Sequence, residues 1–158
     1  MDAIQLLKAD HTKVKELLAE LAETTTRAVK RRVDLLAEIN VNLKAHNTIE
    51  EEIFYPAFKE AGEKEEAKMY YEALEEHRAA GDLVLPDLLN TKPDSENFSG
   101  RAKVLKELIE HHVKEEEGQM FKNAKKLFSG EELAQLGKRM EQRKAEVIKE
   151  LKRSRTAA

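Results

Sequence analysis

The chain has 158 residues, and although 37% of them are charged the net charge is only −3, so the strongly basic face of a nucleic-acid binder is not expected. Cysteine is absent, which excludes disulfides, thiolate zinc sites and iron–sulfur clusters and leaves His, Asp, Glu and Tyr as metal-binding side chains. No apolar run approaches the roughly 20 residues that cross a bilayer, and the charged N-terminus does not resemble a signal segment. We therefore expect one cytoplasmic domain, residues 1–158, without a membrane partner.

The first third of the chain predicts a helical hairpin. Apolar residues that recur at spacings of three and four indicate a helix over residues 3–23, which the threonines at 24–26 end. A second, longer helix is expected over residues 27–61. Pro56 lies inside it and should disturb it, because proline lacks a backbone donor.

The rest of the chain predicts a second hairpin and one more helix. The same periodicity indicates helices over residues 64–89 and 101–128, with a turn-rich loop at 90–100 between them. A last helix is expected at about 130–152. No segment alternates with a period of two for long enough to be a strand. We therefore predict an all-α fold, an antiparallel up-down four-helix bundle over about residues 3–128 with an additional C-terminal helix.

The histidines form an internal repeat. Of the five histidines, four fall into two pairs with the same separation, and two glutamates share it. One shift of 66 residues superimposes His11 on His77, His46 on His112 and Glu50 on Glu116. The two hairpins therefore carry the same chemical set in the same order, as expected for halves related by an approximate two-fold axis.

These six repeated residues have the composition of a metal site. Residues four apart share one helix face, so His46 lies beside Glu50 and His112 beside Glu116, within the apolar stripes. Burying such groups unpaired would cost roughly 2–7 kcal/mol each, a penalty that a bound cation removes. Imidazole and carboxylate without sulfur suit iron, manganese or zinc, and six side chains exceed the four ligands of a structural zinc site.

Four stretches carry a resemblance to a known family: LLKADH (6–11), HNTIEEEIFYP (46–56), LEEH (74–77) and HHVKEEEGQMF (111–121). With them the chain resembles the bacterial hemerythrin-like proteins, also called the HHE cation-binding family. The resemblance implies a non-haem site of two iron ions with a bridging oxo or hydroxo group, although manganese or zinc also suits these residue types. The ligands that it implies are His11, His46, Glu50, His77, His112 and Glu116.

One position departs from the family pattern. Oxygen-carrying members have a further histidine one turn before the position of His77, where this chain has Ala73. The departure argues against a reversible oxygen carrier and favours more exchangeable positions or a substitute ligand. Tyr55, five residues after Glu50, is the candidate substitute, since some bacterial relatives use a tyrosine there. The alternative is a core tyrosine whose hydroxyl is bonded elsewhere.

The neighbours of the predicted ligands have supporting roles at most. His111 breaks the repeat, because its counterpart is Ala45, and we interpret it as facing solvent or assisting a ligand. Glu51 and Glu115 are candidates for accepting a hydrogen bond from a ligand histidine. The competing pair of His111 with Glu115 as ligands does not fit the shift of 66.

The predicted function is the handling of small oxygen or nitrogen species at the di-iron site. Peroxide or dioxygen chemistry, such as catalase-like decomposition, and sensing both fit, so turnover is left open. Reversible binding of dioxygen or nitric oxide without turnover is the alternative. Iron storage or delivery ranks lower, because the Glu-x-x-His motifs of ferritin-like bundles do not occur. We expect a small-molecule ligand (dioxygen, peroxide or nitric oxide), no nucleic-acid partner, and a monomer or weak homodimer.

Overall fold

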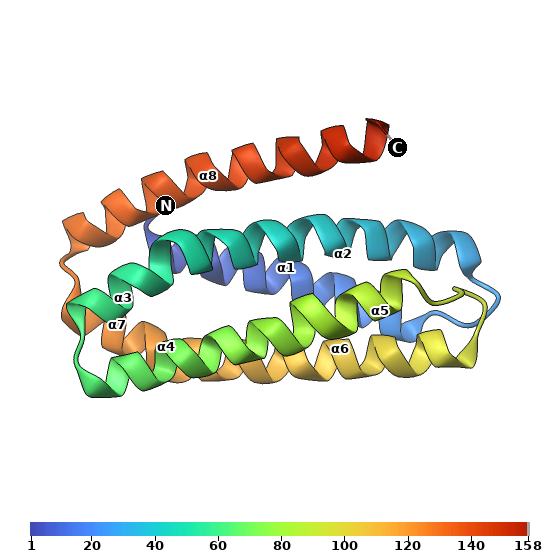
Figure 1. The fold of residues 1–158 in the computed structure, drawn as a ribbon, viewed down its shortest axis with the longest axis horizontal. Helices are drawn as coiled ribbons and strands as arrows, with labels where there is room; N and C mark the ends of the chain where they lie inside the picture. The colour runs from blue at the N-terminus through green and yellow to red at the C-terminus, as the bar shows by residue number, and fades with distance from the viewer. Residues whose placement is uncertain (158) are drawn as a thin grey trace.

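The structure, a computed structural model, describes residues 1–157 and the side chains as far as residue 154. Over these residues the chain is all-α, without strands, and five helices pack as a bundle (Figure 1). The fold class predicted from the sequence is therefore confirmed. None of the described helices combines the length and apolar character that a membrane crossing requires.

The first hairpin follows the predicted bounds closely. Its first helix is α1 (Ala3–Glu23), and Asp2 begins it by accepting a hydrogen bond from the Gln5 backbone amide. The second helix starts two residues later than predicted and has three parts, α2 (Val29–Ile49), η1 (Glu50–Phe54) and α3 (Tyr55–Ala61).

The second hairpin differs from the prediction at one helix start. Its helices comprise α4 (Lys64–His77), η2 (Arg78–Val84), α5 (Leu85–Leu89), α6 (Glu96–Glu115), η3 (Glu116–Met120) and α7 (Phe121–Leu127). The helix expected from residue 101 begins at Glu96, so the loop is shorter than residues 90–100. The reason is a cap, since the Ser95 hydroxyl accepts from the Phe98 amide and satisfies a free donor of the first turn.

Three of the long helices contain a widened turn in which a backbone amide donates to the carbonyl five residues earlier. These hydrogen bonds run from Tyr55 to Glu50, from Leu85 to Ala80 and from Phe121 to Glu116. Pro56 and Pro86 follow the first two turns directly, so the disturbance expected at Pro56 takes this form. Two of the turns, η1 and η3, are themselves 66 residues apart, so the repeat extends to the backbone.

The apolar core is divided into two clusters that flank the predicted site. One cluster includes Leu7, Phe54 and Phe58 and reaches α7 and α8. The other includes Ile39 and Leu105 and fills the bundle towards the loop between α5 and α6. The predicted ligands lie between these clusters, where apolar packing on both sides excludes water and holds them rigidly.

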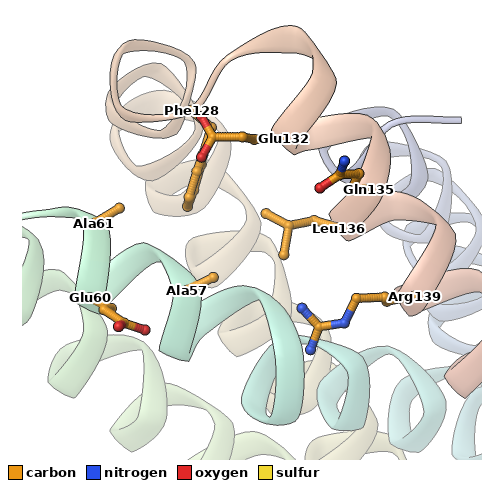
Figure 2. A pocket seen from close by; sticks show the side chains of 8 residues that line it. All are labelled: Ala57, Glu60, Ala61, Phe128, Glu132, Gln135, Leu136 and Arg139. Atoms are coloured by element: carbon orange, nitrogen blue, oxygen red, sulfur yellow. The ribbon is translucent and has the colours of Figure 1, made fainter.

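The fifth helix, α8 (Gly130–Ala157), continues past the predicted end near residue 152 and lies along the outside of the bundle against α1, α2 and η1 (Figure 1). Gly137 permits close approach, because an added Cβ would lie 2.4 Å from the Met1 carbonyl oxygen. Nearer its start, α8 stands off from α3, and Leu136 and Arg139 point across a surface hollow of about 310 Å³ towards Ala57 (Figure 2). The buried apolar residues of α8 nevertheless run from Leu133 to Val147, so the helix docks from near its start to beyond its middle.

Candidate metal centre

The structure brings the six residues predicted as ligands into one buried cluster. Each hairpin contributes three of them, and none is more than 5% exposed. Their donor atoms form two overlapping groups, each within 4.8 Å, that share Glu50. The first group contains His11, His46, Glu50 and Glu116, and the second contains Glu50, His77 and His112. We call these the first and second half-sites.

All four imidazoles turn the same nitrogen, Nε2, towards the centre. Nε2 of His11 lies 3.0 Å from one carboxylate oxygen of Glu116, and Nε2 of His112 lies 3.1 Å from the other. Nε2 of His46 faces Glu50 at close range. In the second half-site the Nε2 atoms of His77 and His112 are 3.3 Å apart. Glu116 thus reaches into both halves of the site, as a bridging carboxylate would.

The outward nitrogens, Nδ1, all meet carboxylates, which we call the outer carboxylates. The four pairs are Asp10 with His46 at 3.1 Å, Glu51 with His77 at 2.9 Å, Glu76 with His112 at 2.8 Å and Glu117 with His11 at 2.6 Å. Because a carboxylate can only accept, each Nδ1 must carry a proton, which leaves Nε2 as the nitrogen that can bind a cation, once any proton on it is lost. Such contacts fix the tautomer and the ring orientation of metal-binding histidines.

Only one of the outer carboxylates was predicted from the sequence. Glu51 lies where it was expected, but Glu115 is exposed, and the carboxylate on His11 belongs to Glu117. Glu115 faces away because it lies one residue before Glu116 on the same helix, about 100° round from the inward face. Asp10 and Glu76, which are equivalent by the 66-residue repeat, were not predicted.

A signal for the missed residues was present in the sequence. Asp10 and Glu76 are 66 residues apart, as are Glu51 and Glu117, so the outer carboxylates obey the same repeat as the ligands. His111, by contrast, has a 59% exposed side chain and contacts Glu76 at 3.3 Å. It faces solvent and touches the site only through that carboxylate.

The buried cluster contains polar atoms without hydrogen-bond partners, which tests whether a cation fits. Among the described side chains these atoms include Nε2 of His11 and His46, both carboxylate oxygens of Glu50 and one oxygen of Glu116. They lie close together and face one another, although an uncompensated buried polar atom is costly. Cations bound between them would satisfy all of these atoms at once, so the residues present fit a metal centre.

Charge is balanced within the cluster by protons when no cation is bound. Burial lowers the pKa of His46, but Glu50 and Asp10 outweigh it and raise the pKa to about 10. The pKa of His112 is likewise raised well above its ordinary value, against burial, chiefly by Glu116. Burial raises the pKa of Glu116, but His112 outweighs it and holds that pKa well below its usual range. A cation therefore competes with these protons for the same atoms.

Tyr55 places its hydroxyl at the second half-site. The oxygen lies 3.1 Å from Nε2 of His77 and 3.3 Å from Nε2 of His112, and the hydroxyl donates to Glu116 at 2.5 Å. Burial, followed by the nearby Glu116 carboxylate, raises the pKa of this phenol well above its ordinary value. Tyr55 and the buried Ala73 belong to the same core cluster. The hydroxyl thus lies where an additional ligand of the second half-site would have to lie.

A small cavity adjoins the first half-site. It measures about 10 Å³, which is room for about one water-sized molecule. Three of the ligand histidines line it, together with two polar side chains and four apolar ones: His11, His46, His112, Asp10, Asn47, Val14, Leu43, Ile109 and Val113. A cavity of this size accommodates a molecule of a few atoms.

Comparison with known proteins places these features in a family. The model of the Hemerythrin HHE cation binding domain matches residues 2–124. The uncharacterized protein Rv2633c of Mycobacterium tuberculosis (strain ATCC 25618 / H37Rv) is 31% identical over 120 residues, which are 76% of this chain and 70% of that protein.

Two further similarities cover nearly the whole chain. The crystal structure of a Hemerythrin HHE cation binding domain-containing protein from Mycobacterium kansasii, a homolog of Rv2633c, matches with a TM-score of 0.81 and 27% identity over 95% of this chain and 89% of that one. A DNA nickase of Nostoc sp. (strain PCC 7120 / SAG 25.82 / UTEX 2576) is 25% identical over 159 residues, covering 100% of this chain. This chain spans only 43% of that relative's length.

Proposed function

The chain belongs to the Hemerythrin HHE cation binding domain family, and from that premise we propose that it holds two iron ions in the bundle core and handles small oxygen or nitrogen species there. The residues that would hold the ions are His11, His46, Glu50, His77, His112 and Glu116. The observation that carries the proposal is the set of buried Nε2 and carboxylate atoms that face one another without partners.

The donor set favours two ions of a redox metal over one structural ion. Four imidazoles and two carboxylates exceed the four ligands of a structural zinc site, and the cluster divides into two half-sites. Imidazole with carboxylate is a ligand combination that iron accepts readily. When bound, an iron pair supplies one-electron redox steps and open coordination positions for dioxygen, peroxide or nitric oxide.

The chain's own residues select for a small ligand and keep the site dry. Val14, Leu43 and Val113 line the cavity beside the first half-site, and its volume of about 10 Å³ admits only a few atoms. The six predicted ligands are at most 5% exposed, and an apolar cluster lies on either side of them. In such surroundings the charged groups act on each other strongly, because little water screens them.

Protons are held at defined atoms around the site. Each ligand histidine donates its Nδ1–H to an outer carboxylate, which orients the ring and supports Nε2 as a donor. The Tyr55 hydroxyl donates to Glu116 and lies beside both second-half histidines. We propose Tyr55 as an additional ligand of the second half-site, a role in which its hydroxyl would release to solvent the proton that it now donates to Glu116.

The test starts with protein purified after expression in iron-supplemented medium. Metal content and the visible absorption spectrum are measured first, and about two iron ions per chain are expected. Hydrogen peroxide is then added while oxygen release is followed, with a His46→Ala variant and free iron as controls. Oxygen release above that of free iron, lost in the variant, supports peroxide chemistry. Iron-free protein after such expression, with unchanged stability on adding ferrous iron, would contradict the proposal.

The alternative is reversible binding of dioxygen or nitric oxide without turnover. It would show as a visible spectrum that changes on exposure to the gas and returns on its removal, with no oxygen release from peroxide. Ala73, buried where carriers have a further histidine, argues for the peroxide proposal over this one.

A further inference from the structure

The two half-sites have matching outer carboxylates, but these carboxylates have different neighbours. Asp10, on His46, and Glu76, on His112, are equivalent by the 66-residue repeat. Asp10 also forms an ion pair with Lys144 of α8. Among the described side chains, the polar partners of Glu76 are its ligand histidine and the exposed imidazole of His111, at 3.3 Å. The two halves of the centre therefore differ in what surrounds their outer carboxylates, although the ligands themselves match.

The ion pair is well shielded from solvent. The side chain of Lys144 is 23% exposed and that of Asp10 is 8% exposed. A charge pair in such a position interacts more strongly than one at the surface, because water and salt screen it less. Asp10 lies within the region matched by the family model, which ends at residue 124, whereas Lys144 lies beyond it, in α8.

The docking of α8 leaves little freedom for this lysine. Seven residues before it, Gly137 lies against the backbone of Met1–Ala3, and four residues before it Met140 is fully buried in the core. On the adjacent face Arg143 binds Glu52 at 2.7 Å. Contacts on both sides hold the helix against α1 and η1, so the ammonium group is presented to Asp10 by a fixed element.

We propose that Lys144 is a positioning residue that acts through Asp10 on His46 and so makes the first half-site differ from the second. The ammonium group holds the Asp10 carboxylate in the orientation that accepts Nδ1–H of His46. It also draws charge from that carboxylate, whereas Glu76 keeps its charge for His112. Outer partners of this kind change metal affinity about 10–100-fold when they are removed. The inference rests on the proposed metal binding.

The experiment is a cobalt(II) titration of metal-free protein followed by visible absorption, since an imidazole and carboxylate site binds cobalt and its absorption reports ligation. Wild type should take up two equivalents. In Lys144→Met one equivalent should bind roughly 10–100-fold more weakly and the other should be unchanged. Lys144→Arg, which keeps the cation, should restore most of the loss. Lys149→Met, which removes an exposed lysine of the same helix, is the matched control and should titrate as wild type.

A double variant tests the route through Asp10. In the Asp10→Asn background, Lys144→Met should cause no additional loss of cobalt affinity, because the carboxylate on which the lysine acts is gone. Thermal melting of each metal-free variant verifies that α8 remains docked, and Lys144→Gln replaces Lys144→Met if the latter fails to fold.

The outcomes separate this inference from the proposed function. Two normal cobalt equivalents in a folded Lys144→Met protein, or equal weakening of both, would overturn the inference and leave the metal site standing. Wild type that binds neither cobalt nor iron would overturn the proposed function, and the inference with it. Additive losses in the double variant would show that Lys144 does not act through Asp10.

Discussion

Tyr55 and Phe121 occupy equivalent positions in the two halves of the metal centre and face it with different chemistry. They are 66 residues apart, and the backbone amide of each donates the hydrogen bond that closes a widened turn, to the carbonyl of Glu50 or of Glu116. The Tyr55 hydroxyl enters the second half-site, whereas the Phe121 ring stacks on His11 with centroids 5.8 Å apart and planes 4° from parallel. The six predicted ligands have the same residue type in both halves of the repeat, whereas this aromatic pair does not.

Replacing Tyr55 by phenylalanine should give both halves of the centre the same aromatic residue at this position of the repeat. We expect Tyr55→Phe to fold, since the ring and its packing remain, but to lose any tyrosinate-to-iron absorption band of the iron-loaded protein. Tyr70→Phe is the matched control, because Tyr70 packs edge-on against Tyr55 with centroids 6.4 Å apart, outside the ligand cluster. A band that persists in Tyr55→Phe, or that is absent from wild type, would show that Tyr55 is not a ligand.

Metal binding should release protons. The pKa of His46 is about 10 in the metal-free protein, so its imidazole is charged at neutral pH and must lose a proton when Nε2 binds a cation. We expect metal affinity to rise from about pH 6 to about pH 10 and then to level off. Zinc titrations with a competing chelator across this range measure it, and an affinity that is flat or falls with pH would contradict the expectation.

The metal-free protein should show the opposite pH trend in stability. Because the folded-state pKa of His46, about 10, lies above its ordinary value of 6.5, the charged imidazole stabilises the fold fully below that ordinary value. This contribution is lost as the pH rises through the folded-state pKa. Urea unfolding of metal-free protein at several pH values tests the sign, and metal-loaded protein is the comparison.

Glu117 and Glu115 provide a direct comparison of neighbouring carboxylates. Glu117→Gln should weaken metal binding about 10–100-fold, because a carboxylate supports Nδ1–H of His11 better than an amide does. Glu115→Gln should leave the affinity unchanged, since that side chain is exposed. The measurement is the same chelator competition for both variants. Equal effects of the two substitutions would argue that net charge, not contact with His11, determines the affinity.

Arg32 should matter for stability and not for the metal. Its fully buried guanidinium donates to Thr24, to the Pro93 and Ser95 carbonyls and to Ser99, and so ties the start of α2 to the loop before α6. We expect Arg32→Met to lower the free energy of unfolding by at least about 2 kcal/mol, because several buried acceptors lose their donors. Metal affinity should persist, as His46 lies about 21 Å further along the helix at 1.5 Å per residue.

The neighbouring residue supplies the control for this prediction. Arg31 is exposed and pairs with Glu20 at 2.8 Å. Since surface ion pairs contribute little, Arg31→Met should change the free energy of unfolding by less than about 1 kcal/mol. Urea denaturation of both variants compares them, and a similar loss in each would refute a special role for Arg32.

Periodicity predicted the helices well where apolar spacing continues to the helix end. The bounds of α1 agree with the prediction, because the Asp2 cap and the threonines mark both ends clearly. The start of α6 was predicted five residues late. There the capping Ser95 lies inside a turn-rich stretch, and a composition typical of loops concealed a helix start.

The sequence by itself determined which six residues lie inward, since the 66-residue repeat and the spacing of His and Glu by four act through local helix geometry. The tertiary structure decided the rest. His11 and Glu117 are 106 residues apart, and only packing of the two hairpins brings them within 2.6 Å. The position of Tyr55 depended on η1. In a regular α-helix a residue five positions after Glu50 points about 140° away from it. The widened turn removes most of that angle and directs the hydroxyl to the metal centre.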